Sequence, residues 1–132
     1  MYKLLVTGSR DWKDTRVVWN ALDTLYYRNS DDFYLLHGAA RGLDTIASLW
    51  AGDRVHEAGL NIKVKDFPVT DEHWKKYGKR AGMLRNIAMI EKQPDIVLAF
   101  ILNQSPGATQ CADYAEKQGI HVVRFEQTYP QL

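Results

Sequence analysis

Short apolar runs alternate along the chain with segments in which apolar residues recur every three or four positions. Five runs are rich in Val, Ile, Leu and Phe, and they are nearly continuous rather than alternating. This pattern is typical of strands in a parallel sheet that is covered on both faces. The five runs occupy residues 2–7, 33–37, 61–66, 95–100 and 120–125.

Two helices are predicted from single apolar stripes between the first three runs. The stripe of the first contains Val17, Val18, Ala21, Leu22 and Leu25. The stripe of the second contains Leu43, Ile46, Ala47, Trp50, Ala51 and Val55. The second of these helices is followed by Gly59, at the position where a left-handed glycine commonly ends a helix.

Two further helices are predicted in the second half of the chain. The third spans about residues 79–92, and its expected apolar side contains Leu84, Ile87, Ala88 and Glu91, with Met83 and Ile90 beside it. The fourth spans about residues 108–118, uses Cys111, Ala112 and Ala115, and is followed by Gly119. Residues 67–78 form the longest segment without a predicted element, and loops of that length are often functional.

The order of these elements is β-α-β-α-β-α-β-α-β. Because crossovers between parallel strands are right-handed, the order predicts an α/β fold of Rossmann-like, doubly wound type. We expect a mostly parallel five-stranded sheet with helices on both faces. A chain of 132 residues without a long polar linker is expected to form one domain, residues 1–132.

Composition places the chain among ordinary globular proteins, since 45% of its residues are hydrophobic and 25% are charged. Its apolar runs are far shorter than the ~20 residues of a membrane span. The N-terminus enters a strand directly, without the pattern of a signal peptide, so a cytoplasmic location is expected. The lone Cys111 excludes an intrachain disulfide and a cysteine metal cluster, as is usual in a reducing compartment.

The charge is balanced overall but locally concentrated. A net charge of +1 provides no broad field for a long polyanion, which disfavours nucleic acid as a partner. Five cations nevertheless fall within eleven residues that contain no acid: Lys75, Lys76, Lys79, Arg80 and Arg85. This density is sufficient for a small phosphate-bearing ligand.

Unusual residues gather in three turns that follow predicted strands. In parallel sheets, ligands bind outside the carboxyl ends of the strands. Each turn leads to a helix N-terminus, which favours an anion, and glycine lets the backbone approach a phosphate closely. The turns are Gly8-Ser9-Arg10-Asp11-Trp12, His37-Gly38-Ala39-Ala40-Arg41-Gly42-Leu43-Asp44 and Ser105-Pro106-Gly107-Ala108-Thr109.

Any one of these turns would fit an ordinary helix cap, but three at one edge of a sheet favour a phosphate site. Arg10 and Arg41 can add charge-assisted hydrogen bonds, and Ser9 and Thr109 can add hydroxyl donors. The chain has neither G-x-G-x-x-G nor a glycine loop ending in Gly-Lys-Ser/Thr. Standard NAD binding and P-loop ATP hydrolysis are therefore disfavoured, and no cofactor is predicted.

Several single residues have two interpretations. Arg85 and Asn86 adjoin the apolar stripe of the third helix, so Arg85 either faces the cleft or is solvated with a buried stem. Asp44 either binds a ribose hydroxyl or complements the dipole of its helix. His37, at the end of a strand, fits a buried histidine bonded to a backbone carbonyl.

The aromatic residues, and the residues of types that can bind a metal, also have two interpretations. Trp12, Trp74 and Tyr77 are each candidates for stacking on a base, although packing or an oligomer interface is expected for at least two of them. Residues 71–73 combine Asp, Glu and His, but consecutive loop residues cannot all face one ion, and no metal site is predicted. Cys111 is expected to be a small helix residue rather than a nucleophile.

The three turns, together with the segment WKKYGKRAGMLRN at residues 74–86, resemble the YspA-like (DUF2493) branch of the SLOG superfamily. That superfamily includes the Lonely Guy phosphoribohydrolases and the DNA-processing protein DprA, and its shared theme is a Rossmann-like fold that holds nucleotides or nucleic acid. The resemblance implies a pocket lined by Gly8, Ser9, Arg10, Gly38, Arg41, Gly42, Asp44, Arg85, Asn86, Gly107 and Thr109. It also implies homo-oligomers, since relatives often pair as homodimers.

The phosphoribohydrolase relatives use an arginine in the third helix and a glutamate shortly after a P-G-G-x-G-T turn. Arg85 matches the arginine. The turn here is S-P-G-A-T, however, and Ala112 stands three residues after Thr109. Asp113 is the nearest acid. The missing glutamate argues against glycosidic cleavage, because an oxocarbenium-like transition state normally requires a carboxylate at the reacting face.

The sequence therefore predicts binding or sensing of a nucleotide or nucleotide-derived small ligand. One alternative is a nucleoside 5′-monophosphate phosphoribohydrolase, with Arg85 and either Asp113 or Asp44 in catalytic roles. A second alternative is binding of single-stranded DNA in the manner of DprA, which depends on the cations at residues 75–85.

Overall fold

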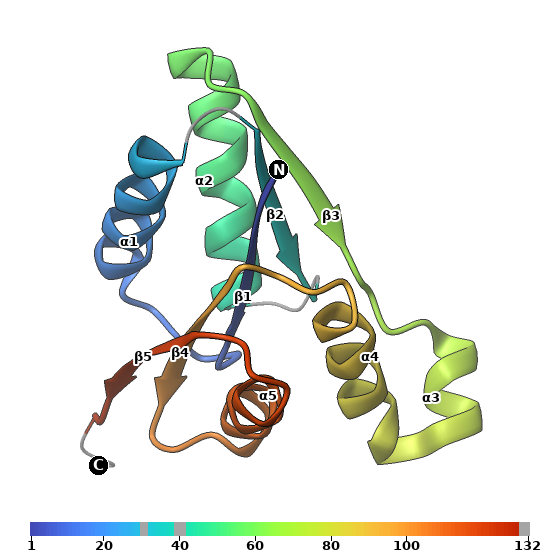
Figure 1. Ribbon diagram of the computed structural model, residues 1–132. Coiled ribbons are helices and arrows are strands. Elements are labelled where there is room, and N and C mark those ends of the chain that lie inside the picture. Colours follow the sequence, from blue (N-terminus) through green and yellow to red (C-terminus); the bar gives the residue numbers. More distant parts are fainter. Residues whose placement is uncertain (30–31, 39–41, 130–132) are drawn as a thin grey trace.

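A five-stranded, wholly parallel sheet runs through the centre of the protein (Figure 1). The computed structural model describes residues 1–29, 32–38 and 42–129. The strands are β1 (Tyr2–Gly8), β2 (Phe33–His37), β3 (Ile62–Asp66), β4 (Ile96–Leu102) and β5 (Val122–Gln127), in the order β3-β2-β1-β4-β5. The order reverses direction between β1 and β4, as in other doubly wound sheets. The predicted Rossmann-like α/β fold is confirmed.

Helices cover both faces of the sheet. On one face lie α1 (Thr15–Arg28) and α2 (Leu43–Ala58), which contact each other, and on the other lie α4 (Ala81–Ile90) and α5 (Pro106–Lys117). Successive residues of β1 serve the two faces alternately, as the pleat of a strand requires. Leu4 and Val6 pack beneath α1 and α2, whereas Leu5 packs beneath α4 and α5.

The two halves of the core differ in the size of their side chains. The α1 and α2 side is rich in aromatic rings, and Trp50, Phe33 and Phe100 are among its fully buried members. The α5 side instead buries small residues, namely Ala108, Cys111, Ala112 and Ala115. Small side chains let α5 lie close against β4, whose seven residues are all buried. This burial explains why the β4 segment reads as a continuous apolar run.

The segment that was expected to be irregular contains a helix. Residues 71–77 form α3 (Asp71–Tyr77), which is followed by the short 3₁₀ helix η1 (Gly78–Arg80), so the third predicted helix begins at Ala81 rather than near residue 79. Thr70 caps α3, since its Oγ1 accepts a hydrogen bond from the backbone N–H of His73 at 3.2 Å. The expectation failed because α3 has no buried residue and therefore no apolar stripe.

The buried face of helix α4 agrees only in part with the one predicted. Its buried residues are Ala81, Asn86, Met89 and Ile90, whereas Glu91, expected on the buried side, is exposed. Asn86 belongs to the buried face because that side of α4 borders a polar cavity. Apolar periodicity could not indicate a buried face that is partly polar.

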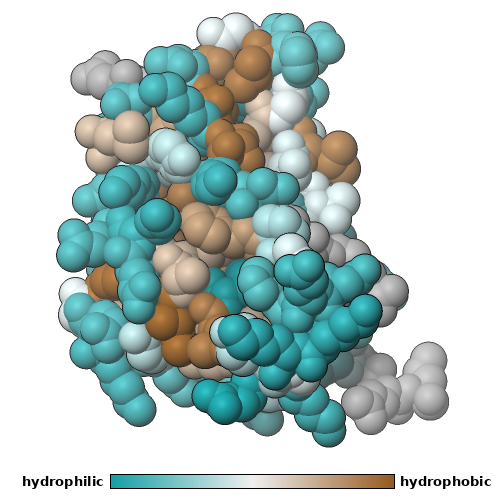
Figure 2. Space-filling model, turned by 90° about the vertical axis from the view of Figure 1, so that its right-hand side faces the viewer, coloured by the Kyte–Doolittle hydropathy of each residue, from teal (hydrophilic) through white to brown (hydrophobic). Residues whose placement is uncertain are grey.

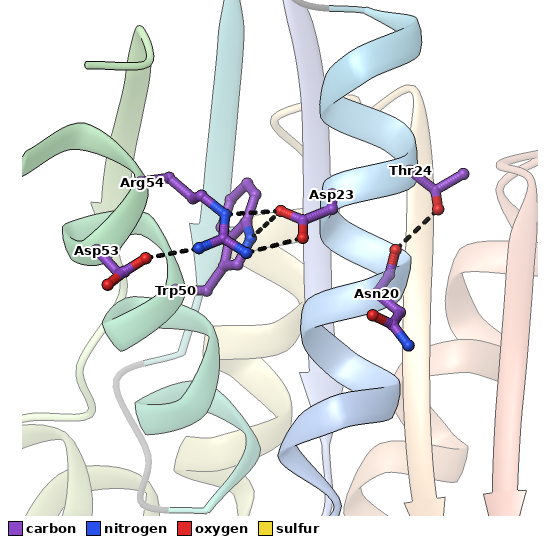
Figure 3. Close-up of polar contacts among 6 residues, drawn as sticks. All are labelled: Asn20, Asp23, Thr24, Trp50, Asp53 and Arg54. Atoms are coloured by element: carbon purple, nitrogen blue, oxygen red, sulfur yellow. Dashed lines mark hydrogen bonds and ion pairs between the residues drawn. The ribbon is translucent and has the colours of Figure 1, made fainter. Parts of the chain in front are cut away.

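A polar cluster joins α1 to α2 (Figure 3). Arg54 donates from Nε and Nη2 to the two carboxylate oxygens of Asp23, both at 2.8 Å, and Trp50 Nε1 donates to the same carboxylate at 2.8 Å. The Arg54 guanidinium also lies 5.1 Å from the ring centroid of Trp19. These contacts lower the pKa of Asp23 and raise the pKa of Arg54, because each side chain stabilises the charge of the other.

No helix in the described part of the chain has both the length and the apolar character needed to cross a membrane.

Candidate functional site

A cavity of about 650 Å³ opens at the carboxyl ends of β1 and β4. This is the point at which the strand order reverses, where doubly wound sheets bind their ligands, and the volume is in the range of small-molecule sites. The N-terminal turn of α5 and one side of α4 form its walls. Eight of the predicted site residues line it: Gly8, Ser9, Arg10, Gly38, Asp44, Arg85, Asn86 and Gly107.

The other predicted site residues lie elsewhere. Gly42 and Thr109 do not line the cavity, and the Thr109 hydroxyl donates to the Ser105 carbonyl at 2.8 Å, one turn back in its own chain. Asp113 is exposed on α5, and its carboxylate accepts a hydrogen bond from Arg124 of β5 at 2.7 Å. Arg41 lies outside the described residues.

Ser9 links the ends of the two central strands. Its backbone N–H donates to the Phe100 carbonyl at 3.0 Å, and its Oγ accepts from the Leu102 N–H at 2.8 Å. The same hydroxyl is hydrogen-bonded to the hydroxyl of Ser105, the N-cap residue of α5. Ser9 therefore positions the α5 N-terminus beside β1, in addition to lining the cavity.

Glycine is required at two of the turns for packing. Gly42 has φ +80° and ψ −121°, and a Cβ there would overlap the backbone of Arg10. A Cβ at Gly8 would overlap the side chain of Leu43, the first residue of α2. The turns after β1 and β2 are thus pressed together. Their glycines are explained by this close approach before any ligand is considered.

Gly38 and Gly107 have different surroundings. A Cβ at Gly38 would overlap the guanidinium of Arg85, so this glycine makes room for a partly buried cation. A Cβ at Gly107 would meet nothing within 4 Å. Gly107 is therefore the glycine of the set whose neighbourhood is open on the cavity side.

Arg85 lines the cavity, and hydrogen bonds fix the position of its guanidinium. Its Nη1 donates to the carbonyls of Gly38 at 2.5 Å and Phe67 at 3.3 Å, and its Nε donates to Asn86 Oδ1 at 2.8 Å. Burial lowers the pKa of Arg85, and the carboxylate of Asp44 acts in the opposite direction. An arginine remains charged in proteins. Nη2 takes part in none of these three bonds and is the nitrogen that can serve a ligand.

Two further titratable groups lie beneath or beside the cavity. Burial lowers the pKa of His37, against the opposing influence of Asp66. Burial raises the pKa of the Cys111 thiol to about 11, which keeps the thiol protonated and unreactive at neutral pH. Among the residues described, no three His, Cys, Asp or Glu side chains gather into a group that could hold a metal ion.

Several cavity residues were not among the predicted site residues: Asn103, Gln110 and also Ser105, which was named only as part of its turn. Asn103 and Gln104 have φ of +51° and +56°, which turns the chain sharply between β4 and α5. Serine before a proline at the first helical position is a recognised N-terminal pattern. That pattern at Ser105-Pro106 was the signal that could have placed Ser105 beside Gly107.

Comparison with known proteins agrees with this geometry. Residues 2–59 match the family model described as "YspA, cpYpsA-related SLOG family". The chain is 40% identical over 129 residues to the Gene 61 protein of Mycobacterium phage D29, covering 95% of this chain and 97% of that protein. No solved structure matches the chain significantly. With a near full-length relative and a family match that contains two of the three cavity turns, this chain belongs to the YspA, cpYpsA-related SLOG family.

Proposed function

We propose that the cavity binds a nucleotide or a nucleotide-derived small ligand, with its phosphate against the first turn of α5. The observation that carries this proposal is the position of the cavity, where the α5 N-terminus meets the ends of β1 and β4. The first N–H groups of a helix have no partner within it, and the helix dipole favours an anion there. The open space at Gly107 supports this placement, and the family membership supports a nucleotide-related ligand in general.

The charges around the cavity favour α5 over α2 as the phosphate site. Asp44 stands in the first turn of α2 and lines the same cavity, so a phosphate at that helix end would meet a negative charge. Arg10 and Lys79 line the cavity and can supply positive charge. In this arrangement, the Asp44 carboxylate is suited to accept hydrogen bonds from ribose hydroxyls.

Thermal unfolding tests this placement directly. We expect at least one of AMP, GMP, CMP and UMP to raise the melting temperature more than its nucleoside does, because the phosphate adds binding energy to the folded state. Gly107→Val should abolish the increase by filling the space at the α5 N-terminus. Gly52→Val is the matched control, since Gly52 also has open space around it but lies within α2, away from the cavity.

Two outcomes would contradict the proposal. If Gly107→Val folded normally and kept the full nucleotide-dependent increase, the phosphate would not lie on α5. If nucleosides stabilised the protein as strongly as their monophosphates, the cavity would not be a phosphate site.

A second candidate function is hydrolysis of the N-glycosidic bond of a nucleoside monophosphate. It is favoured by Asp44, a carboxylate that is 6% exposed and lines the cavity, whereas Asp113 lies outside it. A carboxylate at the reacting face stabilises an oxocarbenium-like transition state. Release of free base, followed by chromatography and abolished by Asp44→Asn, would establish this activity. Stabilisation by a monophosphate without release of base would show that the protein binds the nucleotide but does not hydrolyse it.

A further inference from the structure

The segment formed by α3 and η1, residues 71–80, projects from the body of the protein. All ten of its residues are exposed, and its main contacts with the rest of the described chain are with α4. Figure 1 shows α3 on the outer side of α4. A surface helix normally buries an apolar stripe, but α3 leaves Trp74 and Tyr77 exposed at 41% and 37%. Both rings therefore keep more than a third of their surface accessible to solvent.

One of these two aromatic residues faces the cavity. Trp74 is among the cavity-lining residues, as is Lys79 of η1, whereas Tyr77 is not. The segment thus supplies the cavity with an indole ring and an ammonium group. The phosphate site proposed above lies on a different wall, at Gly107 of α5. The cavity consequently has an anion-binding end and a separate aromatic surface.

We infer that Trp74 stacks on the base of the bound nucleotide and that the α3–η1 segment forms the base-binding wall of the site. This inference rests on the proposed function. A large aromatic side chain that is partly exposed toward a polar cavity is suited to the face of a nucleobase. Stacking on an aromatic ring accepts any base, because every base has a π face.

The surroundings favour a small ligand over a second copy of this chain as the group that contacts Trp74. The cores of protein interfaces are depleted in charged residues. Here α3 and η1 contain Lys75, Lys76, Lys79 and Arg80 together with the acidic Asp71 and Glu72, so the segment around Trp74 is highly charged and positive on balance. Figure 2 shows the side of the molecule on which α3 lies, and hydrophilic residues predominate over its lower half. An anionic ligand fits this surface better than an apolar partner does.

The test compares AMP with ribose 5-phosphate, which has the same phosphate and sugar but no base. Titration calorimetry should show that Trp74→Ala weakens AMP about tenfold and leaves the affinity for ribose 5-phosphate within about twofold. Trp74→Phe should retain most of the AMP affinity, because an aromatic face is kept. Tyr77→Ala is the matched control, since it removes an equally exposed ring from the same helix but outside the cavity, and it should change neither affinity.

Several outcomes would overturn the inference. Equal effects of Trp74→Ala on both ligands, no effect on either, or the same loss in Tyr77→Ala would show that Trp74 does not contact the base. Binding of ribose 5-phosphate without any preference for AMP would preserve the phosphate site and reject the stacking role. If the wild-type protein bound none of AMP, GMP, CMP, UMP and ribose 5-phosphate, both the proposed function and this inference would be wrong. Tighter binding of an oligo-dT strand than of AMP, weakened by Trp74→Ala, would instead make the segment a single-strand site.

Discussion

The glycines around the cavity satisfy different physical requirements. Gly8 and Gly42 allow two turns to approach each other, and Gly38 makes room for the guanidinium of Arg85. Gly107, like Gly82 of α4, lines the cavity and has nothing within 4 Å of an added Cβ. Glycine in a strand-to-helix turn thus indicates close approach of some group, but the group can be the protein itself. The space at Gly107 is the feature of this set that bears directly on a ligand.

Replacing Gly42 by alanine should destabilise the protein by about 2 kcal/mol or more. The left-handed φ of +80° disfavours any L side chain, and the added Cβ would overlap the Arg10 backbone. Gly52→Ala is the matched control within the neighbouring helix. Gly52 is inside α2, and a Cβ added there would have nothing within 4 Å. Alanine should therefore stabilise the protein by about 1 kcal/mol.

Urea unfolding followed by circular dichroism measures both changes. Opposite signs for the two substitutions would confirm that the backbone of Gly42, rather than helix propensity, determines its effect. Similar free energies of unfolding for Gly42→Ala and the wild-type protein would show that the turn can relax, and that the close contact with Arg10 is not required.

The sequence predicted which residue types surround the site better than it predicted their roles. Strand ends and helix starts are local features, and the predicted residues Gly8, Ser9 and Gly107, which lie at such positions, do line the cavity. The direction of a side chain on a helix depends on how that helix is rotated against the sheet. For this reason Thr109 and Asp113, both on α5, could be assigned to the site although their contacts lie elsewhere.

At the level of elements, helices with a buried stripe were predictable and α3 was not. The stripes of α1 and α2 are produced by burial against the sheet, and they mark these helices in the sequence. Helix α3 is held by the Thr70 cap and by contacts with α4, neither of which imposes an apolar period. An exposed helix held in this way has no buried stripe, so its sequence lacks the apolar period from which helices are predicted.

The Asp23–Arg54 pair should couple α1 to α2 with an interaction energy of about 1 kcal/mol. Its geometry is bidentate, and the two side chains are only 27% and 22% exposed. Paired carboxylates and guanidinium groups contribute more when geometry is fixed and solvent is partly excluded. A double-mutant cycle with Asp23→Ala and Arg54→Ala, measured by urea unfolding, gives this coupling energy.

The Asp113–Arg124 pair between α5 and β5 is the comparison for that cycle. It has a similar N–O distance of 2.7 Å, but the Asp113 side chain is 56% exposed. The same cycle should give about 0.5 kcal/mol or less, as is usual for exposed pairs. Equal coupling energies in the two cycles would mean that burial and bidentate contact at Asp23 add nothing to the joining of α1 and α2.

For the whole molecule, the proton balance between the folded and unfolded states defines a range of pH with maximal stability. Folding lowers the pKa of Asp14 through its hydrogen bonds with Gln127 and the Val17 N–H, and burial lowers that of His37. Because of both shifts, the unfolded state binds more protons than the folded state as the pH falls. Burial raises the pKa of Cys111 to about 11 and also raises that of Tyr2. Stability is therefore lost on acidification below about pH 6.5 and on alkalinisation above about pH 9.

At the acid limit of this range, His37 should be responsible for the first loss of stability as the pH falls. Because the folded state resists its protonation, the free energy of unfolding should fall by at most about 1.4 kcal/mol per pH unit below pH 6.5. Measuring unfolding by urea between pH 7.5 and 5 should show that His37→Gln flattens this slope, while His56→Gln, at an exposed histidine of α2, retains it. A slope that is equally steep in His37→Gln would assign the acid sensitivity to other groups. A flattened slope would show that one buried base beneath the cavity sets the acid limit of the whole fold.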